Sequence, residues 1–70
     1  WIKSLAINAI NEGKNQYAPG NGILPLRKTL SEVYQTYYQL QFDYDKEVTI
    51  TNGATEGIFS TILALVNPGD

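Results

Sequence analysis

Residues 48–66 read Val-Thr-Ile-Thr-Asn-Gly-Ala-Thr-Glu-Gly-Ile-Phe-Ser-Thr-Ile-Leu-Ala-Leu-Val, and this stretch decides how the chain is expected to fold. The four β-branched, uncharged residues at 48–51 predict a buried parallel strand. The pair Asn52-Gly53 ends that run, and an apolar helical pattern follows at once over residues 54–66. We therefore expect a strand, a two-residue turn and a helix in immediate succession.

The start of this predicted helix is a candidate anion site. The first backbone N–H groups of a helix have no internal partner, and the helix dipole adds partial positive charge there. Small residues at Gly53 and Ala54 let a phosphate group approach the backbone closely, so the pattern predicts a phosphate site at residues 53–55. A tight connection without any ligand explains the local pattern equally well. A hairpin turn at Asn52-Gly53 is disfavoured, because the following residues do not alternate with period two.

A first helix is expected over residues 1–12. Its apolar residues recur at the spacing of one helix face, namely Ile2, Leu5, Ala6, Ala9 and Ile10. Gly13 suits the position after its last turn, and the turn-forming residues of 14–24 then predict a loop. Gly20-Asn21-Gly22 within that loop is no dinucleotide-binding motif, since no strand precedes it.

A second helix is expected over residues 25–40, because Pro25 suits the first position of a helix. Its apolar stripe comprises Leu26, Leu30, Val33, Tyr34 and Tyr37. Arg27 is assigned to the solvent-exposed face of this helix. The tyrosines at helical spacing are interpreted as packing or surface residues, whereas Tyr17 stands in the loop, where an apolar stripe does not explain it.

Composition excludes several functions. The chain has 70 residues and contains no cysteine and no histidine, so disulfides, thiolate metal sites and the commonest general acid-base residue are absent. The net charge is −2 and the five basic residues do not cluster, which argues against nucleic-acid binding. No apolar run approaches the roughly 20 residues that cross a bilayer, and no signal-peptide pattern is visible. We expect no metal, no membrane partner and a cytoplasmic location.

The sequence is expected to be a segment of a longer protein. It opens at Trp1 within a helical pattern and closes at residues 67–70, a turn that normally leads into another element. The helix predicted at 54–66 is apolar on nearly every face, and such helices lie between other layers of structure. Seventy residues cannot cover it.

Two motifs resemble those of a known family. Residues 15–22, Asn-Gln-Tyr-Ala-Pro-Gly-Asn-Gly, followed by Leu26-Arg27, resemble the N-terminal motif of class I/II aminotransferases, which use pyridoxal 5′-phosphate. Residues 49–59, with the ending Leu-Val-Asn-Pro-Gly-Asp at 65–70, are similar to that family's first phosphate-binding segment. Both motifs occur in order and at the right separation. The resemblance covers essentially the whole chain.

The resemblance implies roles for four residues. Backbone N–H groups at Ala54 and Thr55 would bind the cofactor phosphate, and Gly53 would permit the tight turn. Tyr17 would reach across a homodimer interface and bond the phosphate in the partner's site. The implied fold is α/β, a part of the mainly parallel-sheet large domain of a fold-type I enzyme, in the order helix, loop, helix, strand, helix.

The implied reaction moves an amino group between an amino acid and a 2-oxo acid. The lysine, aspartate and arginine that carry catalysis in the family have no counterpart here, so no catalytic residue is assigned and the chain alone is predicted to be inactive. Glu56 is interpreted as a helix-start residue favoured by the dipole, with a catalytic carboxylate as the alternative. The substrate is not encoded in these residues. A carbon–sulfur lyase, an acyl-CoA-condensing synthase and a non-catalytic phosphate-binding or interaction module are the alternative functions.

Overall fold

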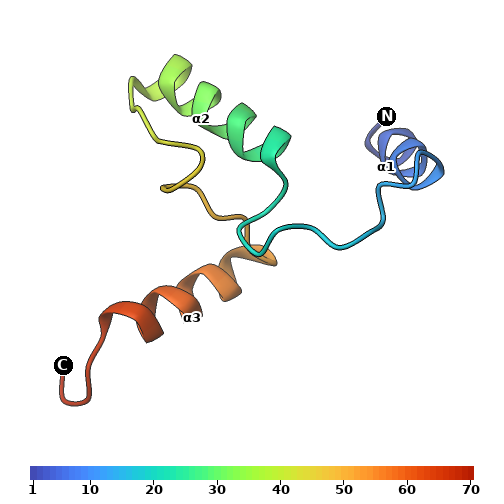
Figure 1. Cartoon of the computed structure of the whole chain (residues 1–70). Coiled ribbons are helices and arrows are strands. Elements are labelled where there is room, and N and C mark those ends of the chain that lie inside the picture. Colours follow the sequence, from blue (N-terminus) through green and yellow to red (C-terminus); the bar gives the residue numbers. More distant parts are fainter.

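The computed structural model describes residues 1–70 and contains three helices and no strand. Helix α1 spans Ile2–Asn11, α2 spans Leu24–Tyr38 and α3 spans Gly53–Leu65. Figure 1 shows that the chain is extended, with its two ends far apart. No two helices pack against each other. The helices are therefore arranged by the segments between them and not by a shared core.

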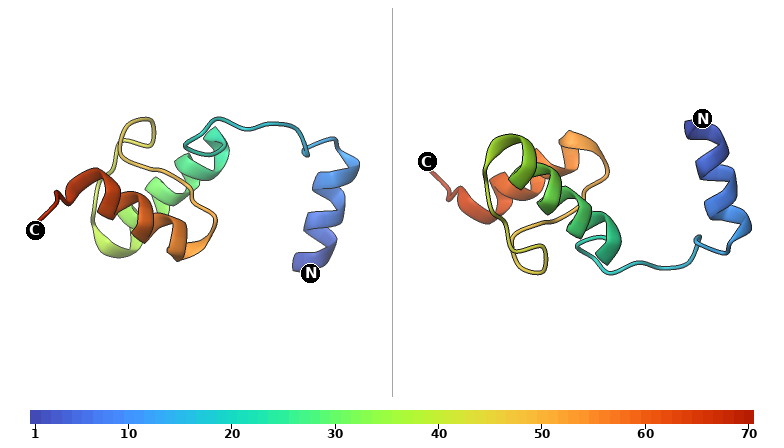
Figure 2. Two further views of the ribbon diagram at one scale, coloured as in Figure 1. Left: turned by 90° about the horizontal axis from the view of Figure 1, so that it is seen from below. Right: turned by 90° about the horizontal axis from the view of Figure 1, so that it is seen from above.

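Helix α1 ends at a well-formed C-terminal cap. Gly13 has φ +77°, and its N–H donates to the carbonyl of Ile10 at 3.0 Å, while the N–H of Lys14 donates to the carbonyl of Ala9 at 2.9 Å. Glycine adopts this left-handed conformation without a Cβ penalty, as expected for the residue after a helix. Figure 2 shows α1 standing apart from the other two helices, at the end of the loop that connects it to α2.

Helix α2 begins one residue earlier than predicted, at Leu24, so that Pro25 occupies its second position. It ends at Tyr38, where Gln39 turns the chain with φ 55°. The following segment folds back along the helix. The rings of Tyr34 and Phe42 meet edge to face with centroids 5.6 Å apart, an arrangement favoured by the ring quadrupoles.

The strand predicted at residues 48–51 is not formed. This segment belongs to no helix or strand, and it makes one backbone hydrogen bond to another part of the chain, from the N–H of Ile50 to the carbonyl of Asn21 at 3.0 Å. A β-ladder requires a neighbouring strand along its length, and no second strand exists here. The β-branched residues at 48–51 favour a strand, but they have no partner strand in this structure.

The apolar stripes predicted for the helices do not form a core. No hydrophobic residue is buried, and the one buried residue of the chain is Arg27, at 5% exposure. The stripe of α2 is exposed or half-buried, and the apolar residues of α3, such as Phe59 and Leu63, face solvent. Helical periodicity correctly predicts helices, but burial also needs an opposing surface, which these helices lack.

Candidate functional site

The turn that leads into α3 has the geometry of a tight connection. Asn52 has φ −73° and ψ 79°, and Gly53 has φ +73°. The N–H of Gly53 donates to the carbonyl of Thr51 at 2.9 Å, and the hydroxyl of Thr51 donates to the carbonyl of Gly53 at 2.9 Å. Nothing lies within 4 Å of where a Cβ on Gly53 would stand. Glycine is therefore favoured here by its positive φ and not by lack of space.

The N–H groups that follow this turn are free to bind a ligand. Ala54 and Thr55 lie in the first turn of α3, where the helical ladder supplies no acceptor, and neither donates any of the turn or side-chain hydrogen bonds. Asn52 makes no side-chain cap, so its side chain accepts no hydrogen bond from Ala54 or Thr55. Two neighbouring donors at the positive end of a helix dipole fit an anionic group such as a phosphate.

The carboxylate of Glu56 is held beside this helix start. Its Oε2 atom accepts a hydrogen bond from the N–H of Asn52 at 2.6 Å, the side-chain half of a capping arrangement. This contact fits the interpretation of Glu56 as a helix-start residue. It also leaves the N–H groups of Ala54 and Thr55 unused.

The glycine-rich loop before α2 contacts the segment that precedes the turn. Gly22 has φ +99°, and its N–H donates to the carbonyl of Pro19 at 2.9 Å. A Cβ on Gly22 would overlap Cγ1 of Ile50 and stand 2.7 Å from Cβ of Ile50. The two sequence motifs therefore meet at a contact that only glycine permits. From Ile50 the chain runs directly into the candidate anion site.

The prediction that Arg27 faces solvent is wrong, because its side chain is buried. The Nε atom of Arg27 donates to the carbonyl of Gly22 at 3.0 Å and its Nη1 donates to the carbonyl of Tyr44 at 2.7 Å. Nη1 also lies 3.7 Å from a carboxylate oxygen of Asp45. Arg27 shares a helix face with Leu30 and Tyr34, but these two residues are not buried, so the helical spacing alone does not predict its burial.

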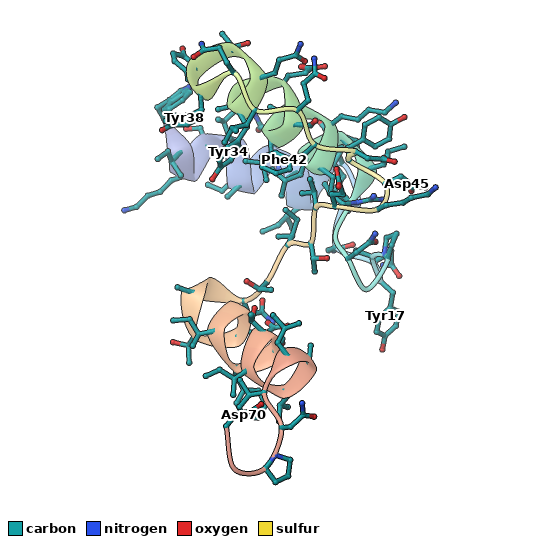
Figure 3. The ribbon with its side chains drawn as sticks, turned by 90° about the vertical axis from the view of Figure 1, so that its left-hand side faces the viewer. Tyr17, Tyr34, Tyr38, Phe42, Asp45 and Asp70 are labelled. Carbon is teal, nitrogen blue, oxygen red and sulfur yellow. The ribbon has the colours of Figure 1, made fainter.

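The side chain of Tyr17 is exposed to solvent and does not join the helix start within this chain (Figure 3). It is fully exposed, at 106% of the reference area. Figure 3 shows Tyr17 at the outer edge of the loop, apart from α3 and from the aromatic pair Tyr34 and Phe42. The chain thus brings Gly53, Ala54 and Thr55 together and does not bring Tyr17 to them. An exposed tyrosine in an irregular loop is available to another surface.

No group of three or more acidic, histidine or cysteine side chains is arranged to hold a metal ion. None of the three helices combines the length and the apolar composition that a membrane-spanning helix needs.

Comparison with known proteins identifies the family. The model of the family "Aminotransferase class I and II" matches residues 1–70. The chain therefore belongs to the class I and II aminotransferases, as the two motifs predicted. Membership implies the fold of pyridoxal-phosphate transferases, although the sheet of that fold is not present in this structure.

Individual relatives are also aminotransferases. Methionine aminotransferase of Escherichia coli K12 is 41% identical over 70 residues, which is all of this chain and 18% of the relative. A probable N-succinyldiaminopimelate aminotransferase of Mycobacterium tuberculosis H37Rv is 42% identical over 64 residues, or 91% of the chain and 16% of the relative. Human kynurenine–oxoglutarate transaminase 3 is 46% identical over 56 residues, or 80% and 12%. No solved structure matches at comparable significance.

These relatives favour one of the functions left open by the sequence. All three are named as aminotransferases or transaminases, and none as a lyase, a synthase or a non-catalytic module. The chain spans less than a fifth of the length of each. It therefore corresponds to a small part of each of these relatives.

Proposed function

We propose that this chain is part of a pyridoxal-phosphate-dependent aminotransferase that moves an amino group between an amino acid and a 2-oxo acid, and that it supplies part of the site for the cofactor phosphate. The observation that carries the second statement is the start of α3. There the N–H groups of Ala54 and Thr55 are free, directly after a turn that requires positive φ at Gly53. Membership of the aminotransferase family supports the phosphate of pyridoxal phosphate as the anion that binds there.

In this proposal the chain's residues bind and orient, and they transfer no proton. Two backbone donors hold oxygens of the phosphate, and the dipole of α3 favours its negative charge without a basic side chain. Holding one end of a cofactor fixes the angle at which its ring meets other groups of the enzyme. When bound, pyridoxal phosphate acts as an electron sink for the bonds to the substrate's Cα atom.

We further propose that Tyr17 acts across a homodimer interface. Its full exposure and its position apart from α3 in Figure 3 support this role, because its side chain is available to a second molecule. An isologous dimer would place each Tyr17 beside the partner's helix start. The mainly parallel sheet, with residues 48–51 as one of its strands, is part of the same proposal.

The phosphate site is tested by two substitutions at one position in the full-length protein. Thr55→Pro removes a backbone donor from the first turn of α3, where proline is tolerated sterically. A hydrogen bond to a charged group contributes about 1.5–3 kcal/mol, so affinity for pyridoxal phosphate should fall tenfold or more. Thr55→Ala keeps the donor and should cost less. Equal losses would mean that the side chain, and not the backbone, makes the contact.

The reaction itself is tested with the purified full-length protein and added cofactor. A panel of amino acids and 2-oxo acids should yield paired transamination products above the background of free cofactor. Release of sulfide, or condensation with an acyl-CoA, in place of transamination would overturn the proposed reaction while leaving the phosphate site intact. Failure to bind the cofactor at all would overturn both.

A further inference from the structure

Arg27 joins three parts of the chain. The residue stands in the first turn of α2, and its guanidinium bonds the carbonyl of Gly22 in the preceding loop and the carbonyl of Tyr44 in the turn that follows. The two carbonyls come from segments on opposite sides of α2 in the sequence. The side chain is 6% exposed, although the rest of the chain has no buried core. A guanidinium suits this position, because its planar fork donates in several fixed directions.

Both hydrogen-bond acceptors of Arg27 belong to parts of the chain that are connected to residues 48–51, the segment before the candidate anion site. Gly22 is in contact with Ile50, and the neighbouring carbonyl of Asn21 accepts the N–H of Ile50 at 3.0 Å. On the other side, Tyr44 lies in a turn closed by the N–H of Glu47, which donates to the carbonyl of Asp43 at 2.8 Å. That turn continues directly into residues 48–51. The segment is thereby fixed at its start and at its middle.

The segment in turn determines where the free donors stand. Only Thr51, Asn52 and Gly53 separate Ile50 from the N–H of Ala54, and these three residues are tied by the two hydrogen bonds between Thr51 and Gly53. A shift of Ile50 would therefore move the start of α3. Phosphate binding by backbone donors is sensitive to such shifts, because hydrogen bonds weaken steeply outside a narrow range of distance and angle.

We propose that Arg27 is a positioning residue for the cofactor-phosphate site: it holds residues 48–51 through the carbonyls of Gly22 and Tyr44 and so places the N–H groups of Ala54 and Thr55. The proposal rests on the proposed function, since it concerns the same phosphate. Arg27 does not touch the phosphate in this account. Its effect is confined to how well the backbone donors meet their acceptor.

The test compares two probes, pyridoxal phosphate and pyridoxal, which differ in the phosphate group. The quantity measured is the ratio of their dissociation constants in the full-length protein, which is independent of how much of a preparation is active. Arg27→Gln should lower this phosphate preference by about tenfold, the equivalent of one hydrogen bond to a charged group. Arg27→Lys should lower the phosphate preference by a smaller factor. An ammonium keeps the charge and can donate to one carbonyl, but it lacks the planar fork that reaches both.

The matched control is Lys28→Gln. Lys28 is exposed, and this substitution removes the same charge from the same part of α2. The Nζ atom of Lys28 lies over the ring of Tyr44, 5.1 Å from the ring centroid, and makes no hydrogen bond to the Tyr44 carbonyl. The phosphate preference of Lys28→Gln should equal that of the wild type. A general effect of positive charge would instead lower the preference equally in Lys28→Gln and Arg27→Gln and would overturn the proposal.

The remaining outcomes also decide the question. If the wild type has a strong phosphate preference and Arg27→Gln keeps it, the positioning role is refuted while the proposed phosphate site stands. The same holds for Arg27→Lys if only that variant folds. If neither Arg27 variant folds while Lys28→Gln does, Arg27 is a residue of general stability and the proposal is overturned. A wild-type preference near one refutes the proposed phosphate site itself and this proposal with it.

Discussion

Because Gly22 contacts Ile50, substitution of Gly22 by alanine should destabilise the protein far more than the same substitution at Gly20 in the same loop. Gly22→Ala places a Cβ that overlaps Cγ1 of Ile50 and lies 2.7 Å from its Cβ, at a residue with φ +99°. A left-handed conformation costs an L-residue about 1–2 kcal/mol. Overpacking adds about 1–3 kcal/mol. The free energy of unfolding should therefore fall by about 2–5 kcal/mol, a large share of the roughly 5–15 kcal/mol that stabilises a typical protein.

Gly20→Ala is the matched control for this substitution. Nothing lies within 4 Å of a Cβ on Gly20, and its φ is not positive. Alanine at a compatible position restricts the unfolded chain, so this variant should be neutral or more stable by up to about 1 kcal/mol. Urea titrations of the two full-length variants, followed by circular dichroism, give the midpoints and slopes. Equal destabilisation of both variants, or no effect of Gly22→Ala, would refute the assigned contact.

Three further predictions concern the isolated chain and the dimer. The 70-residue chain mixed with pyridoxal phosphate should transfer no amino groups, because the lysine that binds the cofactor in this family has no counterpart here; turnover above the free-cofactor background would contradict this. The isolated chain should self-associate or lack a cooperative unfolding transition, since no hydrophobic residue is buried and each fully buried Leu or Ile contributes roughly 1.5–3 kcal/mol; a compact monomer with a sharp transition, seen by sedimentation and calorimetry, would argue against it. Mixing a full-length Tyr17→Ala variant with a variant that lacks the cofactor-binding lysine should restore activity, up to about half the wild-type value per heterodimer by symmetry. No recovery despite proven subunit exchange, with Tyr17→Ala itself severely impaired, would exclude the role across the interface.

The sequence predicted the helices well because their signals are local. Gly13 and Pro25 mark helix ends through their own backbone preferences, and the apolar spacing of each helix is set by its own period. The helix expected at 54–66 runs from Gly53 to Leu65 for the same reason. The turn at Gly53, which frees two backbone donors, was also visible from residue types alone.

The features that depend on distant partners were predicted poorly. The β-branched run at 48–51 indicates a strand, but a ladder needs a neighbour that the sequence pattern does not supply. Arg27 was assigned to the solvent because charged residues are rarely buried unless paired. Its partners are carbonyls of Gly22 and Tyr44, and backbone carbonyls carry no signal of their own in a sequence. The role of Tyr17 depends on a second molecule, and it stays a prediction.

In the proposed function, backbone N–H groups at the start of α3 hold the cofactor phosphate. A crystal structure of the full-length protein with pyridoxal phosphate tests it most directly. Phosphate oxygens should lie at hydrogen-bond distance, about 2.7–3.2 Å, from the nitrogens of Ala54 and Thr55. A phosphate bound elsewhere, or bound by side chains alone with both of these N–H groups unpaired, would overturn the proposed phosphate site.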